Sequence, residues 1–199
     1  MATSIAATGS MTADYAAIAS GLKRQDPELL DTLIETYQHR IMRYLIYLTG
    51  QRDEAEDLFQ ELWLRVLRSG SSYNGTASFE TWLHVIARNL VIDLRRRRRV
   101  SSLDELRPME EGERSFDVAE ERPSPLDSLQ CREKVENLNS AMQALDSRQR
   151  EVLTLRFEQE LPLSDIALIT KTPLCTVKSR LYRGIAALKK HLEGFYLPN

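Results

Sequence analysis

The sequence contains few of the residues that stabilise small secreted folds, and it lacks the long apolar runs that cross membranes. It has two cysteines, eight glycines and seven prolines in 199 residues. Cys131 and Cys175 provide no disulfide framework, so a reduced cytoplasmic protein is the expected class. No run of about 18 apolar residues is present, and no membrane contact of its own is expected. Residues 1–11 lack the basic start and the apolar core of a signal peptide.

The sequence also lacks the alternating runs of β-branched residues that favour strands. Leu, Arg, Glu and Ala dominate instead, which suits helices. Apolar residues recur at helical spacing in three successive stretches, 30–48, 55–67 and 79–94. We expect these three amphipathic helices to pack around one core in a domain over residues 26–99. Residues 1–25 are expected to form a mobile N-terminal tail.

Several residue types mark where these helices begin and end. Asp26 precedes Pro27, which suits the first turn of a helix, and Gly50 is a natural helix stop. Ser78 is the expected cap of the third helix. In the C-terminal part, Asp146 begins a segment of capping-box form and opens another helix.

The C-terminal part predicts a second small helical domain. Residues 100–126 contain three prolines and many acids, so they are expected to be a flexible linker. A domain over residues 127–195 follows. Within it, a short helix at 165–170, a tight break at 171–173 and a longer basic helix from 174 have the helix-turn-helix layout. The expected fold class is therefore all-α, with two small helical domains joined by a flexible acidic linker.

Charge is unevenly distributed, although the net charge is only −2. Residues 171–191 carry six Lys or Arg residues and no acid, and residues 95–99, the arginine run, are five consecutive arginines. Between them, in residues 101–125, eight acids outnumber three arginines. Two basic blocks separated by an acidic linker indicate two surfaces for a polyanion.

The last basic helix combines a narrow apolar stripe with polar and cationic positions. A recognition helix needs small polar side chains for base edges and cations for phosphates. The candidates are Thr176, Lys178, Ser179, Arg180 and Arg183. The alternative is the solvated basic face of a core helix, but the preceding short helix and tight turn favour DNA binding.

The second apolar stretch carries an acidic stripe beside its core face. Glu54, Asp57 and Glu61 follow i, i+3, i+7 spacing. Such a helix would repel DNA, so it indicates a basic protein partner. The alternative is a surface that only keeps the protein soluble.

Aromatic residues surround a polar loop ahead of the third stretch. Tyr73, Phe79 and Trp82 lie near this loop, and Arg88, Asn89 and the arginine run follow. Aromatic rings beside cations suit single-stranded DNA, whose bases stack on the rings. Core packing explains Phe79 and Trp82 equally well.

Three motifs together resemble the extracytoplasmic-function group of the sigma-70 family. They are EAEDLFQE at 54–61, FETWLHVIARN at 79–89 and TVKSRL at 176–181. They occur in family order with family-like spacing, and the resemblance covers about residues 26 to 193.

The resemblance implies a transcription initiation factor, for a stress or envelope response, with core RNA polymerase, promoter DNA and an anti-sigma factor as partners. It implies no catalytic residue, metal ion or cofactor. The residues matching the helix that binds the clamp helices of the polymerase β′ subunit are Glu54, Asp57, Gln60 and Glu61; the β subunit is also an expected partner. Those matching minus-10 recognition and melting are Tyr73, Asn74, Thr76, Ser78, Arg88, Asn89, Arg95 and Arg96. Those matching the minus-35 reader are Thr176, Lys178, Ser179, Arg180 and Arg183.

Two positions depart from the family pattern. The turn position that is often Gly is Lys171, and the Gly that usually precedes Thr176 is Cys175. A left-handed backbone at Lys171 would cost about 1 kcal/mol. These departures bear on the minus-35 sequence preference rather than on the fold.

Two other functions compete with this interpretation. A helix-turn-helix repressor explains the C-terminal half but leaves the acidic stripe and the aromatic loop without a role. A nucleic-acid hydrolase would need a metal or phosphate site, yet His39, His84 and His191 are scattered and no phosphate-binding glycine loop is evident. The acidic stripe could recruit Mg²⁺, but no second carboxylate cluster converges on it.

Overall fold

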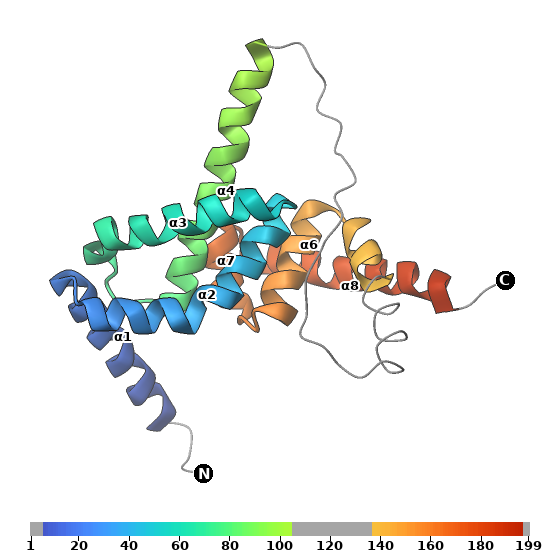
Figure 1. The fold of residues 1–199 in the computed structure, drawn as a ribbon. Coiled ribbons are helices and arrows are strands. Elements are labelled where there is room, and N and C mark those ends of the chain that lie inside the picture. The colour runs from blue at the N-terminus through green and yellow to red at the C-terminus, as the bar shows by residue number, and fades with distance from the viewer. Residues whose placement is uncertain (1–5, 105–136, 197–199) are drawn as a thin grey trace, which may run out of the picture. The chain divides into compact units, whose positions relative to one another are not determined.

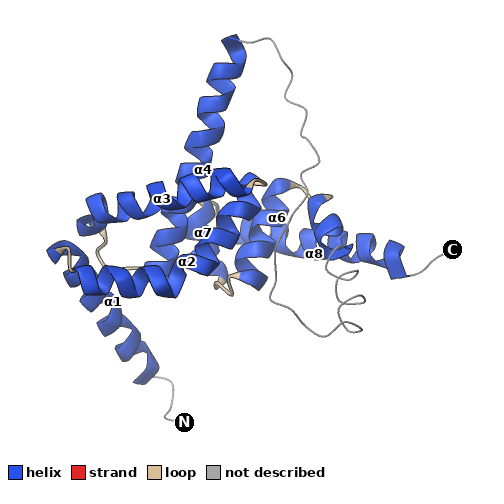
Figure 2. Ribbon diagram, in the orientation of Figure 1, coloured by secondary structure: helices blue, strands red, loops and turns tan. Residues whose placement is uncertain are grey.

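The structure is a computed structural model, described here for residues 6–104 and 137–196. Over these residues Figure 2 shows helices joined by loops, and no strand. The helices are α1 (Ala6–Arg24), α2 (Pro27–Thr49), α3 (Arg52–Ser69), the 3-10 turn η1 (Gly70–Ser72), α4 (Phe79–Asp104), α6 (Ser147–Leu153), the π-helix η2 (Thr154–Glu158), α7 (Leu163–Thr170) and α8 (Leu174–Tyr196). Residues 137–143 are also helical. The expected all-α fold is confirmed.

The described helices belong to two compact units. Helices α1 to α4 make up the first, and most of the residues from α6 onward make up the second (Figure 1). Helix α4 continues to Asp104, so the first residues of the expected linker are helical. The rest of that linker, with Cys131, lies outside the described residues.

The core of the first unit is formed by the apolar stripes of α2, α3 and α4. Its fully buried side chains include Ile41, Tyr44, Leu45, Leu62, Val66 and Leu83. Each large apolar side chain removed from water in this way contributes about 1.5–3 kcal/mol. The three stripes predicted from helical spacing therefore meet in one core, as expected.

The predicted helix caps of this unit are confirmed. The Asp26 carboxylate accepts hydrogen bonds from the backbone N–H groups of Glu28 and Leu29, at 3.2 and 3.4 Å. Gly50 ends α2 in the left-handed conformation, with φ of 73°. The Ser78 hydroxyl accepts from the backbone N–H of Thr81 at 3.1 Å, at the start of α4. Each cap satisfies donors or acceptors that a helix end would otherwise leave unpaired.

The N-terminal segment differs from the expected mobile tail. Residues 6–24 form α1, in which Ala19 and Leu22 are buried. The helix ends at Arg24; Gln25 follows with φ of 55°, and the backbone N–H of Asp26 donates to the Gly21 carbonyl at 3.1 Å. A helix in a folded protein gains most of its stability from tertiary packing rather than from propensity, so the alanine-rich sequence alone did not indicate α1.

The second unit is built around the buried stripes of α6, α7 and α8. Its fully buried side chains include Val152, Leu155, Ile166 and Val177. Asp146 caps α6 as predicted, because its carboxylate accepts from the Arg148 N–H at 3.1 Å. The Arg150 guanidinium donates to the carbonyls of Gln143 and Leu145, which ties α6 to the helical segment before it.

The turn between α7 and α8 contains the unusual backbone expected at Lys171. Its φ is 52°, and the N–H of Thr172 donates to the Ala167 carbonyl at 3.1 Å. This is the Schellman arrangement, in which the residue after the helix is left-handed and is usually glycine. Lysine therefore adopts a conformation that its Cβ disfavours.

Helix α8 packs closely on α6 through a glycine rather than through the expected isoleucine. Helical spacing after Val177 and Leu181 predicts that Ile185 points inward, but it is 38 % exposed. Gly184 is buried instead, and a Cβ there would lie 3.1 Å from Leu153 Cδ1. The inward stripe of α8 thus runs through Val177, Leu181 and Gly184, which rotates the exposed face relative to the prediction.

Over the part of the chain that the structure describes, no helix is long and apolar enough to cross a membrane.

We predict that Lys171→Gly stabilises the second unit by about 1 kcal/mol, because glycine removes the Cβ penalty of the left-handed backbone. Hydrogen–deuterium exchange of the α7 and α8 amides in the full chain measures this change. The matched control is Lys190→Gly, an exposed lysine inside α8, where glycine should instead cost about 1 kcal/mol. Equal losses of protection in both variants would contradict the prediction.

Candidate nucleic-acid and partner interfaces

The outer face of α8 presents cations from a firmly held helix. Val177 and Leu181 are buried and attach α8 to its unit. Lys178, between these two residues, and Arg183, just after them, are exposed. The remaining predicted minus-35 residues, all half-buried, are Thr176, Ser179 and Arg180. This combination of outward cations and small polar groups suits contact with a DNA duplex.

Tyr182 belongs to the same face, although the sequence reasoning did not single it out. It is 68 % exposed. It follows Lys178 by four residues and Ser179 by three, so all three share one side of the helix. Helical spacing could have identified it, since a tyrosine opposite the buried stripe must point to solvent.

Tyr73 is placed differently from its predicted role as a DNA-contacting ring. It is 1 % exposed, and its ring contacts those of Phe79 and Trp82, with centroids 5.6 and 5.3 Å away. Its hydroxyl donates to the Ala77 carbonyl at 2.7 Å. Burial, with smaller contributions from the nearby Tyr15 and Tyr37 hydroxyls, raises the pKa of Tyr73 to about 12, so it remains a donor. The buried Tyr73 side chain therefore holds the loop in place, and its ring is not exposed for a base to stack on.

The exposed part of the loop is Asn74 and Thr76. The Asn74 side-chain oxygen accepts from the backbone N–H and the hydroxyl of Thr76, at 3.1 and 2.8 Å. These bonds fix the carboxamide and direct its remaining hydrogen-bonding capacity outward. Ser78 is engaged in capping α4, where its hydroxyl also lies 2.7 Å from that of Thr81. Asn74 and Thr76 are therefore the loop side chains best placed to meet an extruded base.

The arginine run has both an inner and an outer side. Arg95 donates to the Leu48 carbonyl at the end of α2, at 2.5 Å. Arg98 forms an ion pair with Glu54, with 2.6 Å between Nη2 and Oε1. Arg96 and Arg97 are exposed. The run therefore fastens α4 to the junction of α2 and α3 while offering other cations to solvent.

Two further predicted minus-10 residues, Arg88 and Asn89, lie on α4 and are half-buried.

The ion pair changes the expected role of Glu54 in the acidic stripe. Its side chain is only 15 % exposed because Arg98 covers it. Asp57 and Gln60 are exposed, and Glu61 lies 3.8 Å from Arg65 on its own helix. The surface available to a partner is thus centred on Asp57 and Gln60, while Glu54 holds α4.

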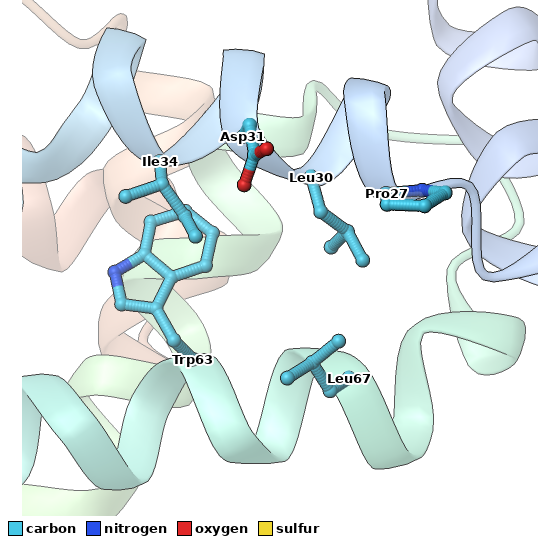
Figure 3. A pocket seen from close by; sticks show the side chains of 6 residues that line it. All are labelled: Pro27, Leu30, Asp31, Ile34, Trp63 and Leu67. Carbon is cyan, nitrogen blue, oxygen red and sulfur yellow. The ribbon is translucent and has the colours of Figure 1, made fainter.

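An apolar pocket continues this surface between α2 and α3. It encloses about 230 Å³ and is lined by Pro27, Leu30, Asp31, Ile34, Trp63 and Leu67. Figure 3 shows Ile34 and Trp63 on one side and Leu30, Leu67 and Pro27 on the other. Leu67 was expected in the core stripe but is 45 % exposed, and Leu64 beside it is 44 % exposed. Exposed leucines next to a pocket suit an apolar side chain of a partner helix.

No group of three or more His, Cys, Asp or Glu side chains is arranged to hold a metal ion within residues 6–104 and 137–196.

Comparison with known sequences relates the two units to one family. Residues 33–100 match Sigma-70 region 2, and residues 141–190 match Sigma-70, region 4. The ECF RNA polymerase sigma factor SigX of Bacillus subtilis (strain 168) is 31% identical over 169 residues, which cover 83% of this chain and 84% of SigX. SigW of the same organism is 30% identical over 174 residues, which cover 86% of this chain and 93% of SigW.

A solved structure shares the fold. The sigma factor RpoE from Bartonella quintana, in complex with the anti-sigma factor NepR, aligns with a TM-score of 0.68 at 22% sequence identity. The alignment covers 82% of this chain and 96% of that chain.

Proposed function

The chain belongs to the extracytoplasmic-function RNA polymerase sigma factors of the sigma-70 family, and from this membership we propose how its two units divide their work. It is a transcription initiation factor that binds core RNA polymerase and brings it to promoter DNA. The observation that carries this function is the presence of both family regions, in order, in one chain. We further propose that it acts in the cytoplasm, serves a stress or envelope response and performs no catalysis.

Promoter reading is divided between a duplex reader and a single-strand reader. We propose that the domain over residues 127–195 reads the minus-35 element through the outer face of α8. The domain over residues 26–99 reads and melts the minus-10 element through Asn74, Thr76 and the cations of α4. Support comes from the outward cations of α8 and from the rigid support of the loop by Tyr73.

Core polymerase binds the outer side of α3 in this proposal. Asp57 and Gln60 supply polar contacts to the β′ clamp helices, and the pocket beside Leu67 receives an apolar side chain. Glu54 positions α4 through Arg98 and does not contact polymerase directly. An acidic surface beside exposed leucines fits a basic amphipathic helix.

Transcription with core polymerase on a library of promoters tests the function as a whole. Initiation that depends on this chain, at a shared pair of upstream elements, is the expected result. Tight sequence-specific binding to duplex DNA by the chain alone at physiological salt, with no effect on polymerase, would favour the repressor instead.

Reversing the charge of Asp57 is expected to weaken polymerase binding about tenfold or more, since the lysine would face the basic partner. Glu56→Lys is the matched control, because Glu56 is exposed on the same helix but pairs with Arg52 at 2.9 Å. Both substitutions lie on the surface and should change stability by no more than about 0.5 kcal/mol. Affinity for core polymerase, measured by competition, should fall in Asp57→Lys alone; equal affinities would remove Asp57 from the interface.

Asn74→Ala and Lys178→Ala are expected to fail at different steps. Without the Asn74 carboxamide the loop cannot offset the few kcal/mol that base extraction costs, so open complexes should decrease while closed complexes form normally. Without Lys178 one phosphate contact is lost, so closed-complex affinity should fall on every promoter and its salt dependence should flatten by about one unit of slope. Permanganate footprinting and closed-complex binding separate the two outcomes. Normal bubble formation by Asn74→Ala would refute the loop assignment.

We propose that an anti-sigma factor controls the chain. The fold matches that of a sigma factor solved with its anti-sigma factor. The polymerase-binding surface also exposes Leu64 and Leu67, which a partner must cover when polymerase is absent. Purification of the chain from its host should therefore yield a complex whose partner protects α3 from hydrogen exchange and competes with core polymerase. Full activity under all growth conditions with no co-purifying partner would argue against this control.

A further inference from the structure

We propose that helix α1 positions the loop over residues 73–78 and so takes part in promoter opening. This inference rests on the proposed function of that loop. It arises from two contacts between α1 and the segment that joins α3 to α4.

The first contact lies at the middle of the loop. Gly75 is left-handed, with φ of 71°, and a Cβ there would lie 3.2 Å from the Tyr15 carbonyl oxygen and 3.6 Å from the Ala16 backbone nitrogen. The loop thus passes directly over the backbone of α1. Glycine is required at this point for both its φ and its close approach. Gly75 separates Asn74 from Thr76, so the contact bears on both exposed loop residues.

The second contact lies where the loop begins. Leu22 of α1 is 4 % exposed, and its Cβ lies 3.3 Å from the position that a Cβ of Gly70 would occupy. Gly70 opens the 3-10 turn η1, whose end is bonded to the loop because the Tyr73 N–H donates to the Gly70 carbonyl at 3.0 Å. Helix α1 therefore supports the segment before the loop as well as its middle.

The loop is held in addition by contacts that do not involve α1, namely the Tyr73 hydroxyl bond to Ala77 and the Ser78 cap of α4. Those contacts fix the end of the loop next to α4. Helix α1 contacts the other end and the middle. A loop held at both ends loses less conformational freedom when it captures a base, which strengthens binding without any new DNA contact.

The experiment compares paired variants of the full chain in holoenzyme. The probe is the single-stranded non-template minus-10 oligonucleotide of a promoter on which the wild-type holoenzyme initiates. Leu22→Ala opens a cavity beneath η1, and its control is Leu33→Ala, an equally buried leucine of α2 at 5 % exposure. Gly75→Ala strains the loop contact, and its control is Gly50→Ala, which introduces the same left-handed strain (φ of 73°) at the end of α2.

Leu22→Ala and Gly75→Ala should bind the oligonucleotide about tenfold more weakly, and both controls should stay within about twofold of wild type. All four variants should retain affinity for core polymerase. Oligonucleotide binding by Leu22→Ala equal to that of Leu33→Ala overturns the inference. If Leu22→Ala does not fold, the glycine pair decides: equal losses in Gly75→Ala and Gly50→Ala overturn it, and a loss in Gly75→Ala alone supports it. Failure of the wild-type holoenzyme to bind the strand would instead refute the proposed role of the loop.

Discussion

The burial of Tyr73 beneath its own loop is the contact on which the DNA-facing surface of the first unit depends. The ring packs against Phe79 and Trp82, and the hydroxyl holds the Ala77 carbonyl. To stack on a base the ring would have to leave the core, at a cost of about 1.5–3 kcal/mol in lost burial. The loop therefore lies on the outer edge of the hydrophobic core, and the packing beneath it holds its exposed polar residues in place.

Individual capping residues in the sequence predicted several helix ends correctly. Asp26, Gly50 and Asp146 act through bonds to backbone groups a few residues away, so a sequence contains everything such a cap needs. Ser164 shows the limit of this reasoning. A serine just before the short helix expected at 165–170 predicts a cap there, but α7 starts at Leu163, and Ser164 lies inside it with its hydroxyl donating to Asp165. Helix α1 was missed because its packing partners are distant in sequence.

Helical spacing predicted which residues share a face, but not how far each face is covered by its neighbours. Ile185 and Leu67 sit at the edges of their stripes and remain partly exposed. Gly184 takes the inward position expected for Ile185, where α6 and α8 approach so closely that even a Cβ would lie 3.1 Å from Leu153. The candidate sites differ from the sequence prediction for the same reason. Tyr73, a predicted DNA contact, is buried in the core, and Tyr182, which was not among the predicted residues, is exposed. The exposure of each of these residues depends on the distances between helices, and the helical repeat of apolar residues does not determine those distances.

The pairing of Arg98 with Glu54 explains why neither the arginine run nor the acidic stripe acts as a uniform charged surface. The pair joins the basic helix α4 to the start of the acidic helix α3, and it neutralises both charges where the helices meet. Other charges of the two helices, such as Asp57 on α3 and Arg96 on α4, are exposed to solvent. At physiological salt, exposed charges separated by more than about 8 Å are largely screened from one another. A chain of nearly zero net charge can therefore attract a basic protein with one surface and an anionic strand with another. Local arrangement, not net charge, decides which partner each surface binds.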